Sequence, residues 1–249
     1  TLPNSYISDV CFDPNDDFTI VVVYSSHQNN GEKVFISNNN GLTWTNITYN
    51  LGNMPVRSVV IDHTNASTIY VGTEHGVFKK AMSSTTWTPY NPDLPNVSVN
   101  EMEIMYGSNT LRANTWGRGL WEFTLDGRAN YPAILTTEIT NPPSEVFPKE
   151  GVDEFVTSVI SYDGTVSSAY VEWSLNSPVF GNVIPMTNTL DSTWVSDQPL
   201  PDAVQGTVVY FKVYAVGDSG DTTETYKFMY TIKPGMYCAS SGSMGRQTA

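Results

Sequence analysis

The sequence has little cysteine, little positive charge and no long apolar run. Its 249 residues include two cysteines, Cys11 and Cys238, which are too few for a disulfide framework. Cys11 lies in an alternating apolar run, where a small buried hydrophobic residue is expected. Cys238 lies in a tail rich in Gly and Ser. Nothing in the sequence favours a bridge between them, and their redox state stays open.

The shortage of positive charge limits the partners of the chain. Twelve Lys and Arg residues stand against 25 Asp and Glu residues, which gives a formal net charge of −13 at pH 7. Nucleic acids and anionic membrane surfaces are bound by clustered Lys and Arg, so neither is expected as a partner. No apolar stretch is long enough to insert into and span a bilayer, and no signal peptide is recognisable. The sequence starts without Met, and we expect it to be a piece of a longer polypeptide.

Motifs for catalysis and metal binding are also missing. The sequence holds no phosphate loop, no spaced Cys/His cluster, no Gly-x-Ser-x-Gly and no His-Glu-x-x-His. The three histidines, His27, His63 and His75, fall in expected loops and should be solvated. Turn chemistry explains the acidic loop 13–17. A structural calcium ion there is the alternative, although its six or more oxygen ligands cannot be deduced from spacing. We therefore expect no catalytic residue, and neither a metal site nor a cofactor beyond that calcium.

The chain does contain a repeat of β-forming segments. Aromatic residues make up 12% of the chain, and Val, Ile and Thr are frequent, which is typical of an all-β protein. Three residues recur 43 positions later: Trp44 as Trp87, Leu51 as Leu94 and Val56 as Val99. A unit in the low forties with four short strands is typical of a propeller blade.

The first repeat contains a turn with its own signature, from Ser37 to Trp44. Apolar or β-forming segments flank this Asn/Gly-rich stretch on both sides, which predicts a hairpin. Ser37 and Asn39 can bond local backbone groups, and Gly41 can take a left-handed conformation. Trp44 can then cover the turn from one side.

These residues carry a family resemblance. The spacing of an Asp-box is matched by Ser37, Asn39, Gly41, Thr43 and Trp44, with Asn39 at the usual Asp position. With this Asp-box-like turn and the turn motifs at 72–77 and 115–121, the first half of the chain resembles the C-terminal blades of sortilin-like or BNR-repeat propellers. That superfamily includes xyloglucanases. The resemblance implies that residues 1–127 form about three four-stranded blades of an incomplete β-propeller. Because three blades do not close a ring, the missing blades would come from the parent chain or from another subunit.

The rest of the chain has a different pattern. We expect a linker at 128–135, an immunoglobulin-like β-sandwich at 136–233 and a linker or the start of a further domain at 234–249. About seven short strands over about 100 residues indicate such a sandwich. The segment 171–174, Val-Glu-Trp-Ser, and the strand that starts at Gly206 resemble an immunoglobulin-like or fibronectin-type module of secreted bacterial enzymes and surface proteins.

The resemblance also indicates where a ligand would bind. In the families resembled, the functional mouth is the face opposite the Asp-boxes. That face would carry Glu74, His75, Trp116 and Arg118. There Trp116 could stack on a sugar and Arg118 could pair with a carboxylate. The alternative is that Trp116 and Arg118 only brace the last blade against the second domain.

The expected function follows from this resemblance. It implies a non-catalytic binding and spacer fragment of a large secreted or cell-surface protein, with a glycan or a secreted protein as its ligand. Two alternatives stay open. The chain could be the C-terminal part of a propeller glycoside hydrolase whose catalytic carboxylates lie outside it, or a sortilin-type protein-binding ectodomain.

Overall fold

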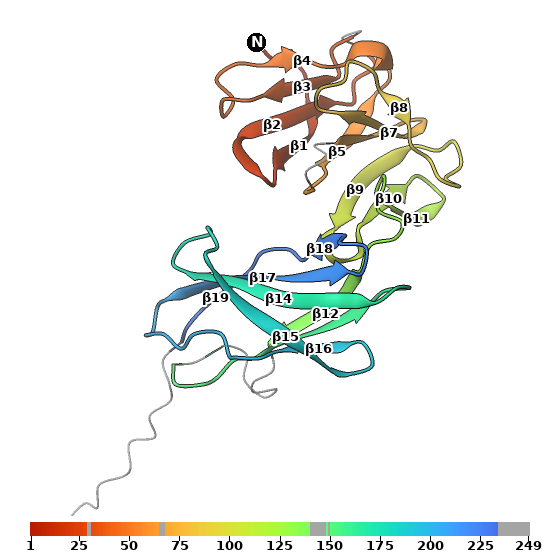
Figure 1. The fold of residues 1–249 in the computed structure, drawn as a ribbon. Helices are drawn as coiled ribbons and strands as arrows, with labels where there is room; N and C mark the ends of the chain where they lie inside the picture. Colours follow the sequence, from red (N-terminus) through yellow and green to blue (C-terminus); the bar gives the residue numbers. More distant parts are fainter. Residues whose placement is uncertain (29–30, 65–67, 140–147, 149, 234–249) are drawn as a thin grey trace, which may run out of the picture. The chain divides into compact units, whose positions relative to one another are not determined.

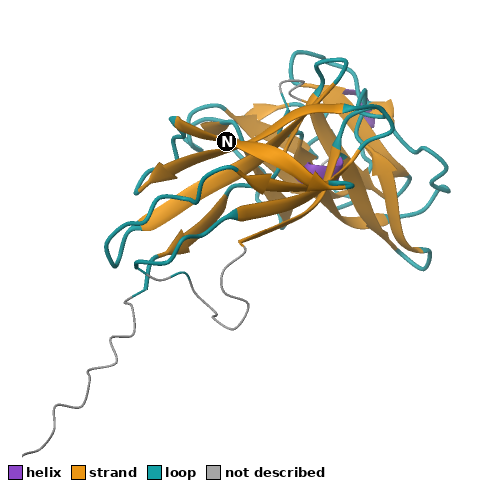
Figure 2. Ribbon diagram, turned by 60° about the horizontal axis from the view of Figure 1, so that its bottom comes forward, coloured by secondary structure: helices purple, strands orange, loops and turns teal. Residues whose placement is uncertain are grey.

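The computed structural model describes residues 1–28, 31–64, 68–139, 148 and 150–233. They form an all-β protein in which strands provide nearly all the regular structure (Figure 2), with two short 3-10 helices, η1 (Tyr49–Leu51) and η2 (Tyr106–Ser108). The chain divides into two compact units, Thr1–Ala129 and Asn130–Ala249 (Figure 1). No helix of the described part is both long and apolar enough to cross a membrane. The expected tail at 234–249, which includes Cys238, lies outside the described residues.

The first unit consists of three antiparallel sheets, and each sheet is formed by consecutive strands in chain order. The first sheet contains β1 (Ile7–Asp13), β2 (Asp16–Tyr24), β3 (Val34–Ser37) and β4 (Thr45–Asn46). The second contains β5 (Val56–Ile61), β6 (Thr68–Thr73), β7 (Gly76–Ala81) and β8 (Thr88–Pro89). The third contains β9 (Val99–Met105), β10 (Thr110–Thr115) and β11 (Gly119–Thr124). Within the described residues, two sheets therefore have four strands and the third has three.

The first two strands of each sheet repeat the same register. The ladders open with the pairs Ile7↔Tyr24, Val56↔Thr73 and Val99↔Thr115. One residue of the first strand is then left out of each ladder, which places β-bulges at Ser8, Arg57 and Asn100. A bulge bends its strand and re-aims the extra side chain. These three residues therefore occupy equivalent positions in the three sheets.

Apolar side chains from both faces of the second sheet hold the unit together. One buried cluster joins it to the first sheet and includes Val21, Val23, Ile47, Val59, Val71 and Trp87. Another cluster joins it to the third sheet and includes Tyr70, Val77, Val99, Ile104, Leu111 and Phe123. Each fully buried side chain of this size contributes about 1.5–3 kcal/mol relative to an exposed one.

Hydrogen bonds of a repeated kind connect the first strands of neighbouring sheets. The backbone N–H of Val59 donates to Asp9 Oδ2 over 2.9 Å. One sheet further on, the N–H of Met102 donates to Ser58 Oγ over 3.0 Å. Asp9 and Ser58 directly follow the equivalent bulges, so the two bonds occupy equivalent places. In the first sheet the corresponding N–H, that of Val10, donates to Oδ1 of its own neighbour Asp9 over 2.8 Å.

The Ser37–Trp44 turn is held by its own polar side chains. Ser37 Oγ accepts hydrogen bonds from the backbone N–H of Gly41 (2.8 Å) and of Asn39 (3.3 Å). Asn39 Oδ1 accepts from the N–H of Thr43 over 2.9 Å, and Asn39 Nδ2 donates to Thr43 Oγ1 over 2.8 Å. Gly41 has φ +84°, a left-handed conformation that costs a glycine little. Asn39 thus supplies the acceptor that a carboxylate would supply, and adds a donor.

The second sheet stabilises its corresponding turn differently. Lys80 lies 43 residues after Ser37 and is 3% exposed. Its ammonium group donates to the backbone carbonyls of Ala81 (3.0 Å), Met82 (3.2 Å) and Ser84 (3.1 Å). A buried ammonium needs such acceptors because desolvation of its charge is costly. One cation therefore replaces the hydroxyl and amide groups that hold the first turn.

Replacing Lys80 with Met should test this role. The carbonyls of Met82 and Ser84 would lose the ammonium donor and that of Ala81 would keep only the N–H of Ser84, so we expect the free energy of unfolding to fall by about 1–3 kcal/mol. Denaturant unfolding followed by circular dichroism gives this value. Lys227→Met, at an exposed lysine, is the matched control and should change it by less than about 0.5 kcal/mol. Equal stability of the two variants would contradict the assignment.

In the first unit, the outward faces of the first and third sheets differ in chemistry. On the first sheet, the face away from the second sheet exposes Val10 (49%), Phe12 (59%) and Phe18 (62%). On the third sheet, the outward face carries charged residues, among them Glu101 and the Arg112–Glu122 ion pair, in which Nε lies 2.6 Å from Oε2. An apolar sheet face is stable when another element covers it, whereas a charged face is stable in water.

The second unit is one continuous sheet that curls around its own core. Its strands are β12 (Ala133–Ile139), β13 (Val156–Ser161), β14 (Val166–Leu175), β15 (Asn182–Leu190), β16 (Thr193–Ser196), β17 (Val208–Gly217), β18 (Thr222–Glu224) and β19 (Phe228–Thr231). They pair in the order β12-β13-β16-β15-β14-β17-β18, and β19 also pairs with β17. β12 lies close to β17 and β18, so the sheet is nearly closed. The enclosed cluster includes Val156, Ile160, Val171, Phe211 and Val213.

This arrangement differs in detail from the expected sandwich of two sheets. β16 pairs with both β13 and β15, and these pairings join all the strands into one hydrogen-bonded sheet. β12 begins at Ala133, inside the stretch 128–135 that was expected to be a linker. The last part of the unit forms two short strands, β18 and β19, because the chain leaves the ladder between Glu224 and Phe228.

Candidate functional site

An open hollow of about 800 Å³ lies in the first unit, at the end of the sheets where their first strands begin. Its lining residues are Ser8, Ser25, Arg57, Glu74, His75, Ser98, Asn100 and Trp116. All three sheets contribute to it. A volume in the range of about 300–1,000 Å³ is typical of a ligand site.

The lining comes from equivalent positions of the three sheets. One set consists of the bulge residues of the first strands, Ser8, Arg57 and Asn100. The other set consists of the residues that directly follow the second strands, Ser25, Glu74 and Trp116. The positions are equivalent but the side chains differ. The arrangement of the three sheets therefore determines the shape of the hollow, and the identities of the residues determine its chemistry.

Arg57 and Glu74 form the charged part of the hollow. Arg57 Nη2 lies 2.9 Å from Glu74 Oε1, and His27 Nε2 lies 3.3 Å from the same oxygen. The Nε of Arg57 is buried without a hydrogen-bond partner within the described residues. Glu74 therefore holds the guanidinium at the hollow while one of its donors is left unused.

His75 projects from a tight turn at the rim. Its backbone N–H donates to Thr73 Oγ1 over 3.0 Å, and its Nδ1 lies 3.3 Å from Asn96 Oδ1. The turn ends at Gly76, whose φ is +97°. A Cβ at this position would lie 2.4 Å from Asn91 Oδ1, so only glycine fits. The geometry of Glu74 and His75 therefore depends on the glycine that follows them.

Trp116 supplies the apolar surface of the hollow and is 76% exposed. Its backbone N–H donates to the carbonyl of Ser98 over 2.8 Å. The hydroxyl of Thr115 donates to the carbonyl of Gly119 over 2.7 Å and closes the turn that carries the indole. An exposed indole costs free energy in water, so a rigid turn that presents one indicates a contact surface.

Three of the four residues expected on this face line the hollow together: Glu74, His75 and Trp116. Arg118 is exposed and is not among the lining residues; its backbone carbonyl accepts the indole N–H of Trp121 over 3.0 Å. Sequence reasoning missed the bulge residues Ser8, Arg57 and Asn100. The repeat spacing shows that they are equivalent, because they lie 49 and 43 residues apart, but it does not show that their strands have bulges.

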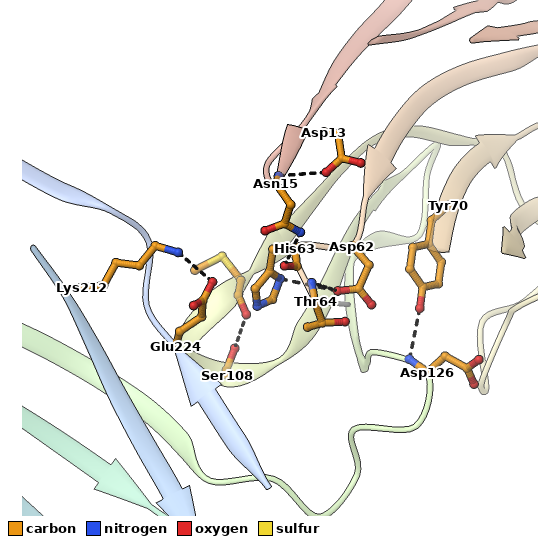
Figure 3. A network of polar contacts seen from close by, with 11 residues as sticks. Asp13, Asn15, Asp62, His63, Thr64, Tyr70, Ser108, Asp126, Lys212 and Glu224 are labelled. Atoms are coloured by element: carbon orange, nitrogen blue, oxygen red, sulfur yellow. Dashed lines mark hydrogen bonds and ion pairs between the residues drawn. The ribbon is translucent and has the colours of Figure 1, made fainter. Parts of the chain in front are cut away.

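A second polar cluster is buried in the unit, away from the lining of the hollow (Figure 3). His63 was expected to be solvated, but it is 4% exposed and stacks on Tyr106 with ring centroids 3.8 Å apart. Asp62 Oδ1 lies 3.6 Å from His63 Nδ1 and accepts the backbone N–H of Thr64 over 2.9 Å. Asn15 Nδ2 donates to the carbonyl of His63 over 2.7 Å. These contacts tie the β1–β2 turn to the segment that follows β5.

The acidic loop 13–17 uses its carboxylates within the turn. Asp13 Oδ1 accepts the N–H of Asn15 over 2.9 Å. Asp16 accepts from the N–H of Phe18 (3.1 Å) and from the hydroxyl of Thr19 (2.6 Å), and these bonds lower the pKa of its carboxyl group. Across the described ranges, no group of three or more His, Cys, Asp or Glu residues is placed to hold a metal ion.

Cys11 does not offer a reactive thiolate. It is partly buried against the cluster between the first two sheets, and burial raises the pKa of its thiol to about 11. Nucleophilic cysteines need a lowered pKa, because the thiolate is the reacting species.

The raised pKa of Cys11 predicts a pH effect on stability. The folded state holds this proton more tightly than the unfolded state, whose thiol has a pKa near 9.0. The stabilisation is intact below pH 9 and is lost as the pH rises to about 11, which amounts to about 2–3 kcal/mol. The free energy of unfolding is measured for the wild type and for Cys11→Ala across pH 8–11, and the difference between the two proteins is followed with pH. A difference that does not change with pH would contradict the assignment.

Comparison with known proteins finds similarity only at a low level, and only to solved structures. No family model matches the sequence, and no curated protein matches it. Among solved structures, the chain is similar to the crystal structure of the GH74 xyloglucanase from Xanthomonas campestris. The match has 10% sequence identity and a TM-score of 0.35, and it covers 88% of this chain. The chain spans 38% of the length of that enzyme.

Proposed function

We propose that this chain is a non-catalytic, carbohydrate-binding part of a secreted or cell-surface protein, and that the hollow of the first unit is its binding site. The observation that carries the proposal is the lining itself. Three equivalent β-bulges aim polar side chains into the hollow, beside an indole that is 76% exposed. Sugars have apolar C–H faces and many hydroxyl groups, so they are bound by an aromatic platform flanked by fixed polar groups.

The polar groups suit hydroxyl ligands. Asn100 has both a donor and an acceptor, and Arg57 offers guanidinium donors that are already oriented by Glu74. His75 adds a ring nitrogen at the rim. Pre-oriented donors bind at a lower entropic cost than free side chains do.

The same lining favours binding over hydrolysis. Glycosidases use two carboxyl groups about 5–9.5 Å apart on either side of the scissile bond. Glu74 is the single carboxylate among the described residues that line the hollow, and Arg57 pairs with it. A hydrolase that contained this chain would therefore need catalytic carboxylates from elsewhere in the parent protein.

A glycan array combined with a hydrolysis assay tests this function. We expect the full chain to bind a defined set of oligosaccharides and to release no reducing sugar from them. Binding to no glycan on a broad array would overturn the proposal. Turnover of a bound glycan by this chain alone would overturn its non-catalytic part.

We also propose that the first unit belongs to an Asp-box-type propeller and that another four-stranded sheet of the parent chain covers its first sheet. Trp44 and Trp87 are 43 residues apart, yet Trp87 is 1% exposed between two sheets and Trp44 is only half-buried. The N–H of Val10 bonds within its own strand, where the equivalent N–H groups bond to a preceding sheet. A covering sheet would bury the exposed Phe12 and Phe18. It would also offer the N–H of Val10 an acceptor on a preceding sheet, as Val59 and Met102 have.

Cysteine labelling distinguishes a covered face from a free one. In a Phe12→Cys variant, a maleimide reagent should label position 12 of this chain rapidly. In the longer parent polypeptide, the same position should be protected by at least about tenfold in rate. Equal labelling rates in the two proteins would overturn the proposed cover.

A further inference from the structure

A second hollow, of about 510 Å³, lies in the second unit at one end of the curled sheet. It opens between the turn that joins β13 to β14 and the turn that joins β15 to β16. Ile160, Val166 and Trp194 give it an apolar side, while Tyr162, Asn188 and Asp191 give it a polar side. Mouths of curled sheets are frequent ligand sites, and this volume is in the usual range of about 300–1,000 Å³.

The ring of Tyr162 is fixed in place by close packing and hydrogen bonds. Its hydroxyl donates to Asp218 Oδ1 over 3.3 Å and lies 3.4 Å from Ser219 Oγ. A Cβ at Gly164 would lie 2.7 Å from the ring, and a Cβ at Gly217 would lie 3.0 Å from it. A side chain at either glycine would therefore crowd this ring near its Cε1 edge. The two glycines and Asp218 hold an aromatic surface at the mouth of the hollow.

The opposite turn is also rigid. Asn188 Nδ2 donates to the carbonyl of Asp191 over 2.9 Å, and the N–H of Ile160 donates to the carbonyl of Ser192 over 2.8 Å. Asp191 has a left-handed backbone with φ +48°, and its side chain is exposed at the rim. The turn thus places Asp191 at the rim, and Trp194 pairs with Asn188 across the sheet.

The lining limits the charge of a ligand. No Lys, Arg or His is among the described lining residues, whereas Asp191 is. An anion would have no positive partner and would meet this carboxylate. A metal ion is not favoured either, because no cluster of three acidic or His/Cys ligands exists in the part of the chain that the structure describes.

We propose that this second hollow binds a neutral saccharide unit. Tyr162 and Trp194 provide the aromatic surfaces against which the C–H faces of a sugar ring pack. Asp191 accepts sugar hydroxyl protons, and Asn188 and Thr165 add further polar groups. Charge-assisted hydrogen bonds to a carboxylate are the stronger kind, so Asp191 determines the affinity for hydroxyl ligands. This site is independent of the hollow in the first unit.

The test uses the full chain with the first site weakened by Trp116→Ala. This protein is titrated with neutral oligosaccharides, namely glucan, xylan and mannan fragments, and binding is followed by two-dimensional NMR. We expect backbone shifts at Tyr162, Thr165 and Asp191. Adding Asp191→Ala should weaken the binding by at least about tenfold. Adding Trp194→Leu, which keeps an apolar side chain against the core, should abolish it.

Asp163→Ala is the matched control, because Asp163 is exposed in the β13–β14 turn and does not line the hollow. It should leave the binding unchanged. Circular dichroism shows whether Trp194→Leu is folded, and the exposed Asp191→Ala keeps the test valid if it is not. The proposal is overturned if no saccharide shifts these resonances or if Asp191→Ala binds as tightly as its parent. Preference for a quaternary ammonium ion over every saccharide would also overturn it.

Discussion

Replacing Trp87 with Ala should lower the free energy of unfolding of the first unit by about 3–5 kcal/mol. The side chain is 1% exposed and lies in the cluster that joins the first and second sheets. Its indole N–H donates to the carbonyl of Ile47 over 2.9 Å, and its backbone exchanges two hydrogen bonds with the amide of Asn50. The substitution removes apolar contacts and leaves a buried carbonyl without its donor. Thermal and denaturant unfolding measure the loss.

Trp44→Ala is the matched comparison, because Trp44 occupies the equivalent position one repeat earlier. Trp44 is only half-buried and packs against the face of the first sheet that points away from the second sheet. Its replacement should therefore cost roughly half as much or less, since the cost scales with the buried contacts removed. Equal losses at the two positions would show that the first sheet is as well covered as the second.

Trp116→Ala should weaken glycan binding by about 30-fold, the loss typical of a central aromatic anchor that contributes about 2 kcal/mol. The exposed indole makes few contacts with the protein, so the stability should change by less than about 0.5 kcal/mol. Isothermal titration calorimetry with the best glycan from the array measures the change in affinity.

Leu120→Ala controls for a general effect of the β10–β11 hairpin. Leu120 is 66% exposed on the neighbouring strand and does not line the hollow. Its replacement should leave the affinity unchanged. If Trp116→Ala and Leu120→Ala weaken binding equally, the hairpin acts through its conformation and the indole makes no specific contact.

Local patterns predicted much of the first unit. The spacing of Trp44 and Trp87 predicted a repeat of short strands, and the Asn/Gly-rich stretch before Trp44 predicted a hairpin, which β3 and β4 form. Such signals depend on neighbours in sequence, so they can be read directly. Lys80 shows the limit of these signals. It is the repeat equivalent of Ser37, but the repeat did not indicate that an ammonium group would hold the turn.

The composition of the hollow could be predicted only in part. Glu74, His75 and Trp116 follow from turn positions. Arg118 was expected beside them, but the third turn, from Thr115 to Gly119, is one residue longer than the turn from Thr73 to Gly76. Trp116 directly follows β10 as Glu74 directly follows β6, and the longer turn separates Trp116 from Arg118, which does not line the hollow.

Non-local contacts explain the remaining differences. Arg57 enters the hollow because its strand has a bulge, and nothing in the surrounding residue types marks a bulge there. His63 is buried because Tyr106, 43 residues later, stacks on it. In the second unit, the pairing of β16 with β13 joins segments more than 30 residues apart, which no local pattern reveals.

The indole N–H resonances of the six tryptophans offer the most direct test of the proposed binding site. Each can be assigned by substitution and followed in two-dimensional NMR while the glycan is added. We expect the Trp116 resonance to shift with the calorimetric affinity, while the buried Trp87 resonance stays in place. Saturable glycan binding that leaves the Trp116 resonance unmoved would contradict the proposal that the hollow of the first unit is the carbohydrate site.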